Sequence, residues 1–490
     1  MDPSRRSLLV GAALAGAGGL ALSAQAARAA DRKVLRLHYR TIEVDGKPAR
    51  RYRVSQPSGE WGLTLKQGDM FDVRLENNLD VLSGLHWHGL NPPWRQDGVP
   101  YLSAPPIAPG KFADYSFPAQ PTGTRWMHSH FGLQEQNLAA APLIVRETDA
   151  IKSGVQEVVV MFEDFSWRQP EEIFVELRKP KPAMAMGGGS MPMGNMPMPI
   201  TGGTTSMARG GGMPPASAPK PDLNDVTYDA YLANDRTLAD PEIFDVEAGA
   251  DVRLRLINGA ASSNFVVEFG GLEVTLLTVD GNPIVPVKLA ALPLAIAQRA
   301  DVMLRMPADR RAVPVVARGE GRTLQTGVIL RPAGAAVEKV AVNGATAAPE
   351  VGLALERMLR ASEPLASRPV DQTVPVDLTG NMAAYIWGMS IHGVEALPVT
   401  VEKGQRVELT MRNTTMMSHP MHLHGHSFQV VEIDGQRIAG AFRDTVLVTP
   451  RATIKVAFDA DNPGMWAFHC HNLYHMEAGM FATMVYRGFS

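Results

Sequence analysis

Residues 469–480 bring together side chains that could hold a redox-active metal: His469, Cys470, His471, His475 and Met480. Cys470 is the only cysteine of the chain and stands between two histidines. One thiolate with two imidazoles and a weak axial thioether is typical of a blue-copper electron-transfer centre. The segment therefore predicts copper redox chemistry, with Cys470 as a metal ligand rather than half of a disulfide.

Three more His-x-His pairs lie upstream, at His86/His88, His128/His130 and His422/His424. In a β-strand, residues i and i+2 point to the same face, so each pair presents two imidazoles side by side, ~6.6 Å apart along the strand. Cys470 then faces away from its two neighbouring histidines, and one short segment touches two sites on opposite sides of a strand. The eight paired histidines are enough for three coppers that take two, three and three of them. The residues left for a blue-copper site on the other face are His419, Cys470, His475 and Met480.

The 13 histidines are unevenly distributed along the chain. Ten belong to the two sites, and we expect structural or surface roles for His38, His392 and His426. Residues 131–391 contain no histidine, so these ligands come only from the two ends of the chain. The histidine cluster must therefore lie where the first and last parts of the protein meet, with the middle part acting as a spacer.

The elements that must position these ligands are predominantly strands. Stretches such as 71–75, 252–256 and 407–411 alternate apolar and polar residues, and Gly and Pro punctuate such runs. Three segments, 68–79, 249–260 and 404–415, repeat one pattern that runs from Gly through an alternating strand to Asn. Repetition of this kind predicts related domains. We expect an all-β protein with β-sandwich domains at 32–148, 149–335 and 370–490, and a linker at 336–369 with a helical segment around 353–360.

The first thirty residues have the features of a twin-arginine export signal. Arg5 and Arg6 precede an apolar run to Leu22 and a small-residue motif that ends at Ala29. A membrane anchor is the alternative, but it would need an apolar run of ~20 residues. We therefore expect export with removal of residues 1–30 and a mature form without a membrane span. The net charge of −3 gives no reason to expect a nucleic-acid partner, and we expect a monomer.

Residues 184–213 form a low-complexity segment with eight methionines and Arg209 as its only charge. Its Gly, Pro, Ser and Thr content favours a loop without a packed core of its own. A tolerated surface insertion is the alternative. Thioethers are soft ligands that suit Cu(I), however, and the segment holds no histidine that would recruit harder ions. We interpret the segment as a copper-recruiting loop.

Four motifs carry a family resemblance: HWHG (86–89), HSH (128–130), HPMHLHG (419–425) and HCHNLYHMEAGM (469–480). They resemble the copper motifs of the multicopper oxidases, the laccase-like family, and the resemblance spans essentially the whole mature chain. It implies three cupredoxin-like Greek-key β-sandwich domains, a middle domain without copper, and four copper ions. Carried onto this chain, it implies a type 1 copper held by His419, Cys470, His475 and Met480. It implies a type 2 copper held by His86 and His422, and a type 3 pair held by His88, His128, His130, His424, His469 and His471.

The resemblance also implies a reaction. The substrate would lose one electron at a time at the type 1 copper, and Cys470 would pass these electrons to its flanking histidines for the four-electron reduction of O₂ to water. Protons must reach the cluster as well, which requires nearby carboxylates. Asp97 matches a position where the family keeps an acid, whereas Met476 stands where other members have one, with Glu477 next to it. For Asp97 and Glu477 a carboxylate that caps a loop turn is the alternative.

The reductant is indicated by weaker signals. The export signal, the methionine-rich loop and TMMSHPMHLHG (415–425) look most like bacterial periplasmic copper-resistance oxidases, which implies a periplasmic enzyme that oxidises Cu(I) to Cu(II). Met416 and Met417 could bind Cu(I) beside His419, with core packing as the alternative. Related cuprous oxidases carry an acid where this chain has Thr415, and Asp444 could substitute for it. A laccase-like phenol oxidase and a non-enzymatic periplasmic copper-binding protein are the alternative functions.

Overall fold

The computed structural model describes residues 32–179, 222–395 and 397–489. In this part of the chain, six β-sheets pair into three sandwiches that follow one another along the sequence. The all-β fold expected from the alternating patterns is therefore confirmed. The expected export signal (1–30) and the methionine-rich segment (184–213) lie outside the described residues.

The first sandwich is built from two four-stranded sheets. One sheet has the order β2 (Lys47–Ser55), β1 (Lys33–Val44), β4 (Met70–Asn77) and β6 (Phe112–Pro118). The other has the order β3 (Leu63–Lys66), β8 (Ala140–Arg146), β7 (Gly123–Ser129) and β5 (Leu85–His86). Every residue of β7 is buried, because this strand packs against β12 and β17 of the middle sandwich and its His128 contacts His471 of the last.

The middle sandwich pairs a six-stranded with a five-stranded sheet. The larger sheet has the order β10 (Ala230–Ala233), β9 (Gln156–Phe165), β12 (Asp251–Asn258), β17 (Arg299–Arg305), β14 (Val274–Val279) and β15 (Asn282–Leu289). The smaller has the order β11 (Ile243–Val246), β19 (Gln325–Pro332), β18 (Val313–Gly319), β13 (Phe265–Glu268) and β16 (Ala291–Leu294).

The last sandwich pairs an eight-stranded with a five-stranded sheet. The larger sheet has the order β22 (Val394–Glu395), β21 (Ile386–Ile391), β20 (Gln372–Asn381), β24 (Arg406–Asn413), β30 (Thr453–Asp459), β26 (Phe428–Ile433) and β27 (Gln436–Arg437), with β28 (Phe442–Arg443) beside β26. The smaller has the order β23 (Val399–Val401), β32 (Phe481–Tyr486), β31 (Met465–Cys470), β25 (His419–Leu423) and β29 (Thr445–Val448).

The three repeated sequence segments are equivalent strands of the three sandwiches: β4, β12 and β24. Each pairs in parallel with the first strand of its sandwich and antiparallel with one later strand. Each ends at an asparagine, Asn77, Asn258 or Asn413, whose Nδ2 donates to two backbone carbonyls at 2.7–3.0 Å. Its Oδ1 accepts the N–H group two residues later at 2.9–3.0 Å. The repeated asparagine therefore fixes the turn that follows the strand.

The helices of the described residues are short. They are the 3₁₀ turns η1 (Trp94–Gln96) and η2 (Gln134–Asn137), and the α-helices α2 (Thr148–Ser153), α3 (Pro170–Leu177), α4 (Ala354–Met358) and α5 (Leu473–Glu477). The helical segment expected around 353–360 is α4. No helix of the described chain has the length and apolar character needed to cross a membrane.

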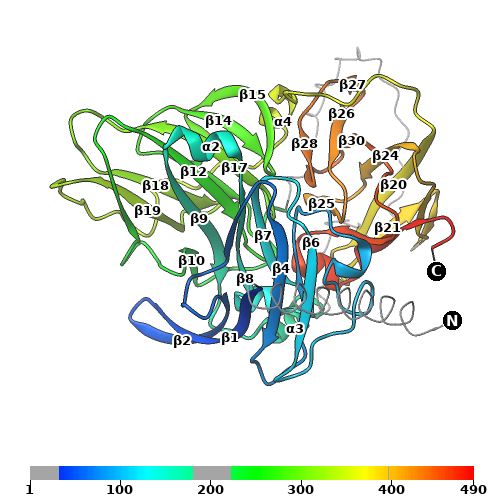
Figure 1. The fold of residues 1–490 in the computed structure, drawn as a ribbon, viewed down its shortest axis with the longest axis horizontal. Helices are drawn as coiled ribbons and strands as arrows, with labels where there is room; N and C mark the ends of the chain where they lie inside the picture. Colours follow the sequence, from blue (N-terminus) through cyan, green and yellow to red (C-terminus); the bar gives the residue numbers. More distant parts are fainter. Residues whose placement is uncertain (1–31, 180–221, 396, 490) are drawn as a thin grey trace, which may run out of the picture.

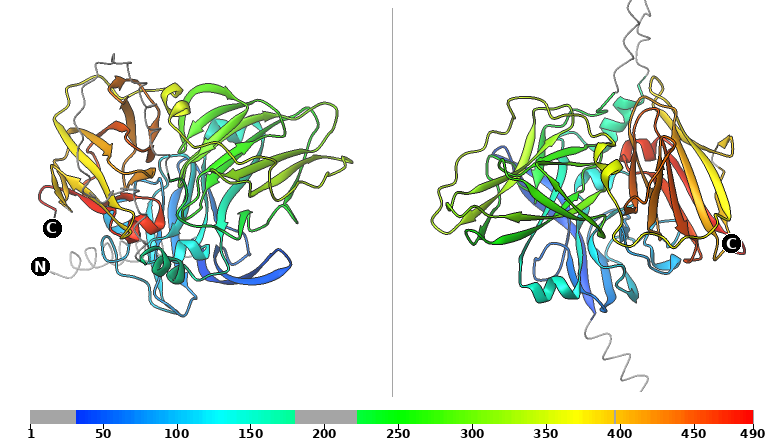
Figure 2. Two further views of the ribbon diagram at one scale, coloured as in Figure 1. Left: turned by 180° about the vertical axis from the view of Figure 1, so that it is seen from behind. Right: turned by 90° about the horizontal axis from the view of Figure 1, so that it is seen from above.

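The sandwiches meet at the centre of the molecule (Figure 1). The middle sandwich (green) and the last one (yellow to red) lie side by side, and the first (blue to cyan) contacts both; the view from above in Figure 2 shows the same arrangement. One apolar core cluster runs through the middle and last sandwiches, and the first sandwich has its own. This packing brings β7 of the first sandwich towards β25 and β31 of the last.

Candidate metal centre

Three of the four residues expected on the cysteine side meet at one point. The Sγ atom of Cys470 lies 3.7 Å from Nδ1 of His419 and 3.7 Å from Nδ1 of His475, and these two nitrogens are 3.1 Å apart. β25 carries His419, β31 carries Cys470, and His475 lies in α5, whose cap Asn472 accepts the N–H groups of Tyr474 and His475. All three side chains are buried, as is Met480, whose backbone carbonyl accepts the N–H of Cys470.

The outer nitrogens of the two imidazoles contact polar side chains. Nε2 of His419 lies 2.7 Å from Oγ1 of Thr415. Nε2 of His475 lies 2.8 Å from Oδ2 of Asp225, which also accepts the hydroxyl of Tyr385 at 2.8 Å. Asp225 belongs to the middle part of the chain, so this part contributes directly to the cysteine site. The expectation that it acts only as a spacer is therefore wrong.

The eight paired histidines converge on the other side of β31. The rings within each pair lie side by side, with centroids 5.7, 5.8, 4.6 and 5.6 Å apart in chain order. Between the first and last sandwiches, Nε2 of His130 lies 3.3 Å from Nε2 of His469, and Nε2 of His128 lies 3.3 Å from Nε2 of His471. The cluster thus lies at the interface of the chain ends, as the distribution of histidines predicts.

The ring nitrogens offer free lone pairs inside this cluster. Nε2 of His86, Nδ1 of His88 and Nε2 of His422 are buried and form no hydrogen bond with any described residue. Ligand atoms of three sets lie within 4.8 Å of one another, namely His86/His88/His128, His86/His422/His424 and His130/His424/His469. Buried polar atoms are normally hydrogen-bonded, so these atoms point to bound metal.

Burial and mutual repulsion keep the imidazoles neutral. The pKa of each of six histidines lies well below its usual range, first because the ring is desolvated and second because neighbouring imidazoles disfavour another positive charge; these are His88, His128, His130, His422, His424 and His471. Burial lowers the pKa of His469 to about 4. Neutral imidazole is the form that binds a metal ion.

Three buried carboxyl groups stand behind the cluster, and each contacts two histidines. Oδ2 of Asp97 lies 2.8 Å from Nδ1 of His424, and its Oδ1 lies 3.1 Å from Nδ1 of His86. Oδ1 of Asp444 lies 3.0 Å from Nε2 of His88 and 3.8 Å from Nδ1 of His422.

The third carboxyl group, Glu135, was not singled out from the sequence. Its Oε2 lies 2.7 Å from Nδ1 of His128, and its Oε1 lies 3.8 Å from Nδ1 of His471. It follows HSH (128–130) by five residues in QEQ (134–136), where nothing in the local pattern distinguishes it from a surface acid.

The structure corrects the position expected for Asp444. This side chain is buried and forms an ion pair with Arg299 beside the histidine cluster, so it does not accompany Met416 and Met417. Asp444 directly precedes β29, at the His422 end of the pairing between β29 and β25. Met417 lies near the other end, where Nδ2 of Asn413 donates to the carbonyls of both Met417 and Val448. Met417 is 3 % exposed and packs in the core, and Met416 is half-buried.

Glu477 is exposed and lines a pocket of about 430 Å³ together with His130, Met476 and Phe481. This pocket reaches the histidine cluster from the surface. Two of the three histidines expected outside the sites have structural partners. His38 contacts Oγ of Ser55 at 2.8 Å, and buried His426 contacts the hydroxyl of Tyr486 at 2.7 Å.

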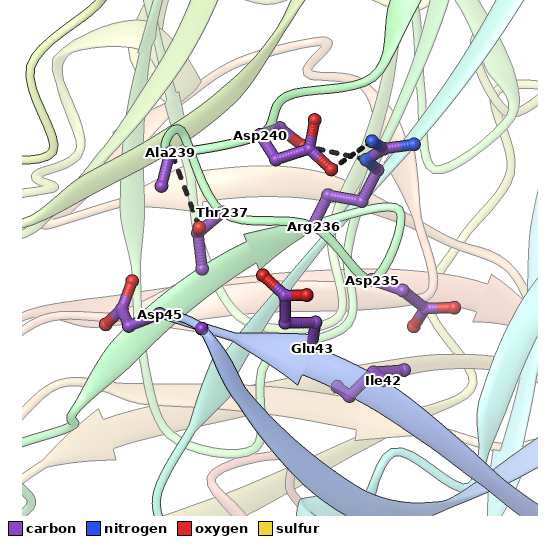
Figure 3. Close-up of a pocket in the computed structure, with 9 residues that line it drawn as sticks. Ile42, Glu43, Asp45, Asp235, Arg236, Thr237, Ala239 and Asp240 are labelled. Carbon is purple, nitrogen blue, oxygen red and sulfur yellow. Dashed lines mark hydrogen bonds and ion pairs between the residues drawn. The ribbon is translucent and has the colours of Figure 1, made fainter.

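A second surface pocket, of about 390 Å³, lies between the β1–β2 hairpin and residues 235–240 (Figure 3). Several carboxylates line it, but Asp235 pairs with Arg40 and Arg53, and Asp240 pairs with Arg236. The figure shows no convergence of these acids on a common point, and we assign the pocket no catalytic part.

Comparison with known proteins agrees with this geometry. Models of the multicopper oxidase family match residues 39–150, 206–336 and 367–488. The chain therefore belongs to the multicopper oxidase family, and it is an oxidoreductase with cupredoxin-like domains.

Individual relatives are similar over most of their length. A multicopper oxidase, MmcO, of Mycobacterium tuberculosis is 33 % identical over 425 residues, which cover 86 % of this chain and 80 % of that protein. A copper resistance protein A homolog of Pseudomonas syringae pv. tomato is 27 % identical, with 86 % of each chain covered. The crystal structure of Fet3p, described as a multicopper oxidase that functions in iron import, superposes with a TM-score of 0.72 at 19 % identity and covers 93 % of this chain and 90 % of that one.

The family takes four copper ions, one of type 1, one of type 2 and a type 3 pair, and the donors present here fit them. A buried thiol between two imidazoles suits copper, and the free ring nitrogens of the cluster suit further coppers.

Proposed function

We propose that the protein is a cuprous oxidase, which takes electrons from Cu(I) at the cysteine site and delivers them to O₂ at the histidine cluster. The proposal rests on the position of the residues that follow the methionine-rich segment in the sequence, because they lie beside the cysteine site. The N–H of Asp222 donates to the carbonyl of Met416 at 3.2 Å, and Asp225 contacts Nε2 of His475. The segment with eight thioethers is thus joined to the residues beside the cysteine site.

We assign the type 1 copper to His419, Cys470, His475 and Met480. The type 2 copper would be held by His86 and His422, whose free Nε2 atoms support this. Nitrogen contacts group His128 with His471 and group His130, His424 and His469 together. The ring centroid of His88 lies 5.6 and 5.1 Å from those of His128 and His471, so we assign one type 3 copper to His88/His128/His471 and the other to His130/His424/His469. When bound, the four coppers accept the four electrons that convert one O₂ to two waters.

The residues around these ligands have separable tasks. Cys470 joins the two sites through its own backbone, because His469 and His471 are its direct neighbours. The Nδ1–H group of His469 donates to the carbonyl oxygen of Cys470, 2.9 Å away. Asp225 presents a carboxylate at the outer edge of His475, where a cation such as Cu(I) would be attracted. The Asp225 side chain is only 3 % exposed, so little water would separate its carboxylate from a reductant bound there.

Asp97 and Glu477 are our candidates for proton delivery. Asp97 is buried between His86 and His424, which favours this role over the capping of a loop turn. Glu477 is exposed at the mouth of the pocket beside His130, where protons and water exchange with solvent. We also propose that the protein acts as a monomer in the periplasm after twin-arginine export. The names of its copper-resistance relatives support a role in copper tolerance.

The test compares two reductants in three proteins. A variant without residues 184–213, and one with the eight methionines of that segment replaced by leucine, should both lose efficiency at limiting Cu(I) while turnover of a small phenol is kept. The leucine variant is the matched control, because it retains length and apolar character and removes only the thioethers. Oxygen uptake is the readout, and excess Cu(I) should largely restore the rate.

Asp225→Asn tests the contact with His475 separately. It should raise the KM for Cu(I) and leave the number of bound coppers unchanged. If the unaltered protein oxidises phenol well but Cu(I) poorly, and the variants change neither rate, the enzyme is a laccase-like phenol oxidase. If the copper-loaded protein consumes no O₂ with either reductant, a copper-binding protein without oxidase activity is the better description.

A further inference from the structure

Glu135 occupies an unusual position for an acid. It lies in η2, directly after the strand that carries His128, and is 4 % exposed. Its Oε2 is 2.7 Å from Nδ1 of His128. Its Oε1 forms no hydrogen bond with any described residue, and the polar atom recorded near it is Nδ1 of His471, at 3.8 Å. A buried carboxyl group normally has several partners, so these two imidazoles are the reason for its presence.

The turn around Glu135 is held rigidly on both sides. Oε1 of Gln134 accepts the hydroxyls of Ser83 and Ser129 at 2.6 and 2.8 Å. On the other side, Nε2 of Gln136 donates to Oδ1 of Asp164 at 3.0 Å. The carboxyl group therefore has little freedom to move relative to the histidines, even though it is carried by a short 3₁₀ turn.

The two histidines that Glu135 contacts also meet each other. Their Nε2 atoms are 3.3 Å apart, which places both lone pairs where one metal ion could accept them. They come from different sandwiches, since His128 lies in β7 and His471 follows β31. One carboxyl group thus spans the interface of the chain ends behind a shared ligand point.

We propose that Glu135 is a positioning residue for the type 3 coppers, which fixes the tautomer and ring orientation of His128 and holds His471 against it. A histidine ligand commonly directs its other ring nitrogen to a carboxylate, and loss of such a partner typically costs about 10- to 100-fold in metal affinity. Asp97 and Asp444 stand in the same relation to His86/His424 and to His88/His422. Glu135 is the third such acid, and it supplies the carboxyl group behind His128 and His471. This inference concerns the cluster and does not depend on whether Cu(I) or a phenol is the reductant.

The test uses Glu135→Leu and Glu135→Gln in the full chain. Leucine removes the polar partner, and we expect copper to dissociate from the cluster at about 10- to 100-fold lower competing chelator concentration. EPR should detect copper that no longer belongs to the coupled, EPR-silent type 3 pair. The blue absorption of the type 1 site should be retained, which would report correct folding. Glutamine keeps an oxygen beside His128 and should restore most of the coupled, EPR-silent copper.

Glu163→Leu is the matched control. Glu163 lies in β9, is 1 % exposed and has two carboxylate oxygens without hydrogen bonds to described residues, but no metal-cluster histidine is recorded beside it. The proposal is overturned if Glu135→Leu binds copper with unchanged affinity and EPR spectrum. It is also overturned if Glu163→Leu changes the coupled pair as much as Glu135→Leu, because the effect would then be a general one of losing a buried carboxyl group.

Discussion

At the scale of single residues, Cys470 links two sites because a strand directs successive side chains to opposite faces. Its Sγ lies between His419 and His475 on one face, while His469 and His471 reach the histidine cluster on the other. Burial raises the pKa of the Cys470 thiol far above its usual range, so a metal cation must displace the thiol proton when it binds.

Cys470→Ser should therefore remove the blue colour and abolish oxidase activity. The histidine cluster should still bind copper, because its ligand atoms lie on the opposite face of β31 and belong to other residues. Visible absorption and copper content measure the two sites separately. A variant that keeps its blue band would contradict the assignment of Cys470.

At the scale of elements, a buried acid helps to attach the linker that follows the middle sandwich. Glu320 follows β18, and its side chain accepts the N–H of Val351 at 2.6 Å and the Nδ2 amide of Asn264 at 2.8 Å. Burial raises the pKa of Glu320 to about 7, and the two hydrogen bonds lower it only partly. The folded protein therefore holds a proton here over a pH range in which the unfolded chain has lost it.

This difference makes stability depend on pH. Since the folded state binds more protons than the unfolded state between pH 4.5 and about 7, the free energy of unfolding should fall as pH rises through that window, by roughly 3 kcal/mol. Glu320→Gln removes the titrating group, so denaturant unfolding of the variant should lack this contribution. An identical pH dependence in the two proteins would show that Glu320 does not retain its proton in the folded state.

At the scale of the whole molecule, the three sandwiches are joined by buried charges beneath the histidine cluster. Arg299, from β17 of the middle sandwich, forms an ion pair with Asp444 of the last and donates through Nε to the carbonyl of Thr124 in the first. Asp444 in turn contacts His88. Arg299 is fully buried, so its loss would remove the cation nearest to the buried carboxylate of Asp444 and leave Arg125, whose Nη1 is 3.7 Å from Oδ2 of Asp444.

We expect Arg299→Met to destabilise the protein by about 3–5 kcal/mol, the typical result of breaking a buried ion pair from one side. It should also lower copper occupancy at the cluster, since Asp444 behind His88 loses its closest ion-pair partner. Arg253→Met is the control, because Arg253 pairs with Glu147 and Asp301 without recorded contact to a cluster histidine. The thermal unfolding temperature and the copper content should both fall for Arg299→Met. The control should lower only the unfolding temperature. Equal copper loss in the two variants would argue against the role of Arg299.

The sequence by itself determined the fold class and the two-sided placement of the paired histidines. Both follow from local rules: the period of two in a strand sets which side chains share a face, and the repeated segments ending in Asn77, Asn258 and Asn413 follow from one hydrogen-bonding pattern at each turn. The absence of histidine between 131 and 391 then requires the two ends of the chain to meet.

Only the tertiary structure decided which charged side chains contact the ligand histidines or support those contacts. Asp225, Glu135 and Arg299 lie 250, 336 and 145 positions along the chain from the residues they contact, His475, His471 and Asp444. No local period relates such residues, because their proximity depends on how whole sandwiches pack. The same reason explains why the position expected for Asp444, beside Met416 and Met417, was wrong. The packing of the sandwiches, and not the neighbouring residues in FRDTV (442–446), directs its side chain towards Arg299 and His88.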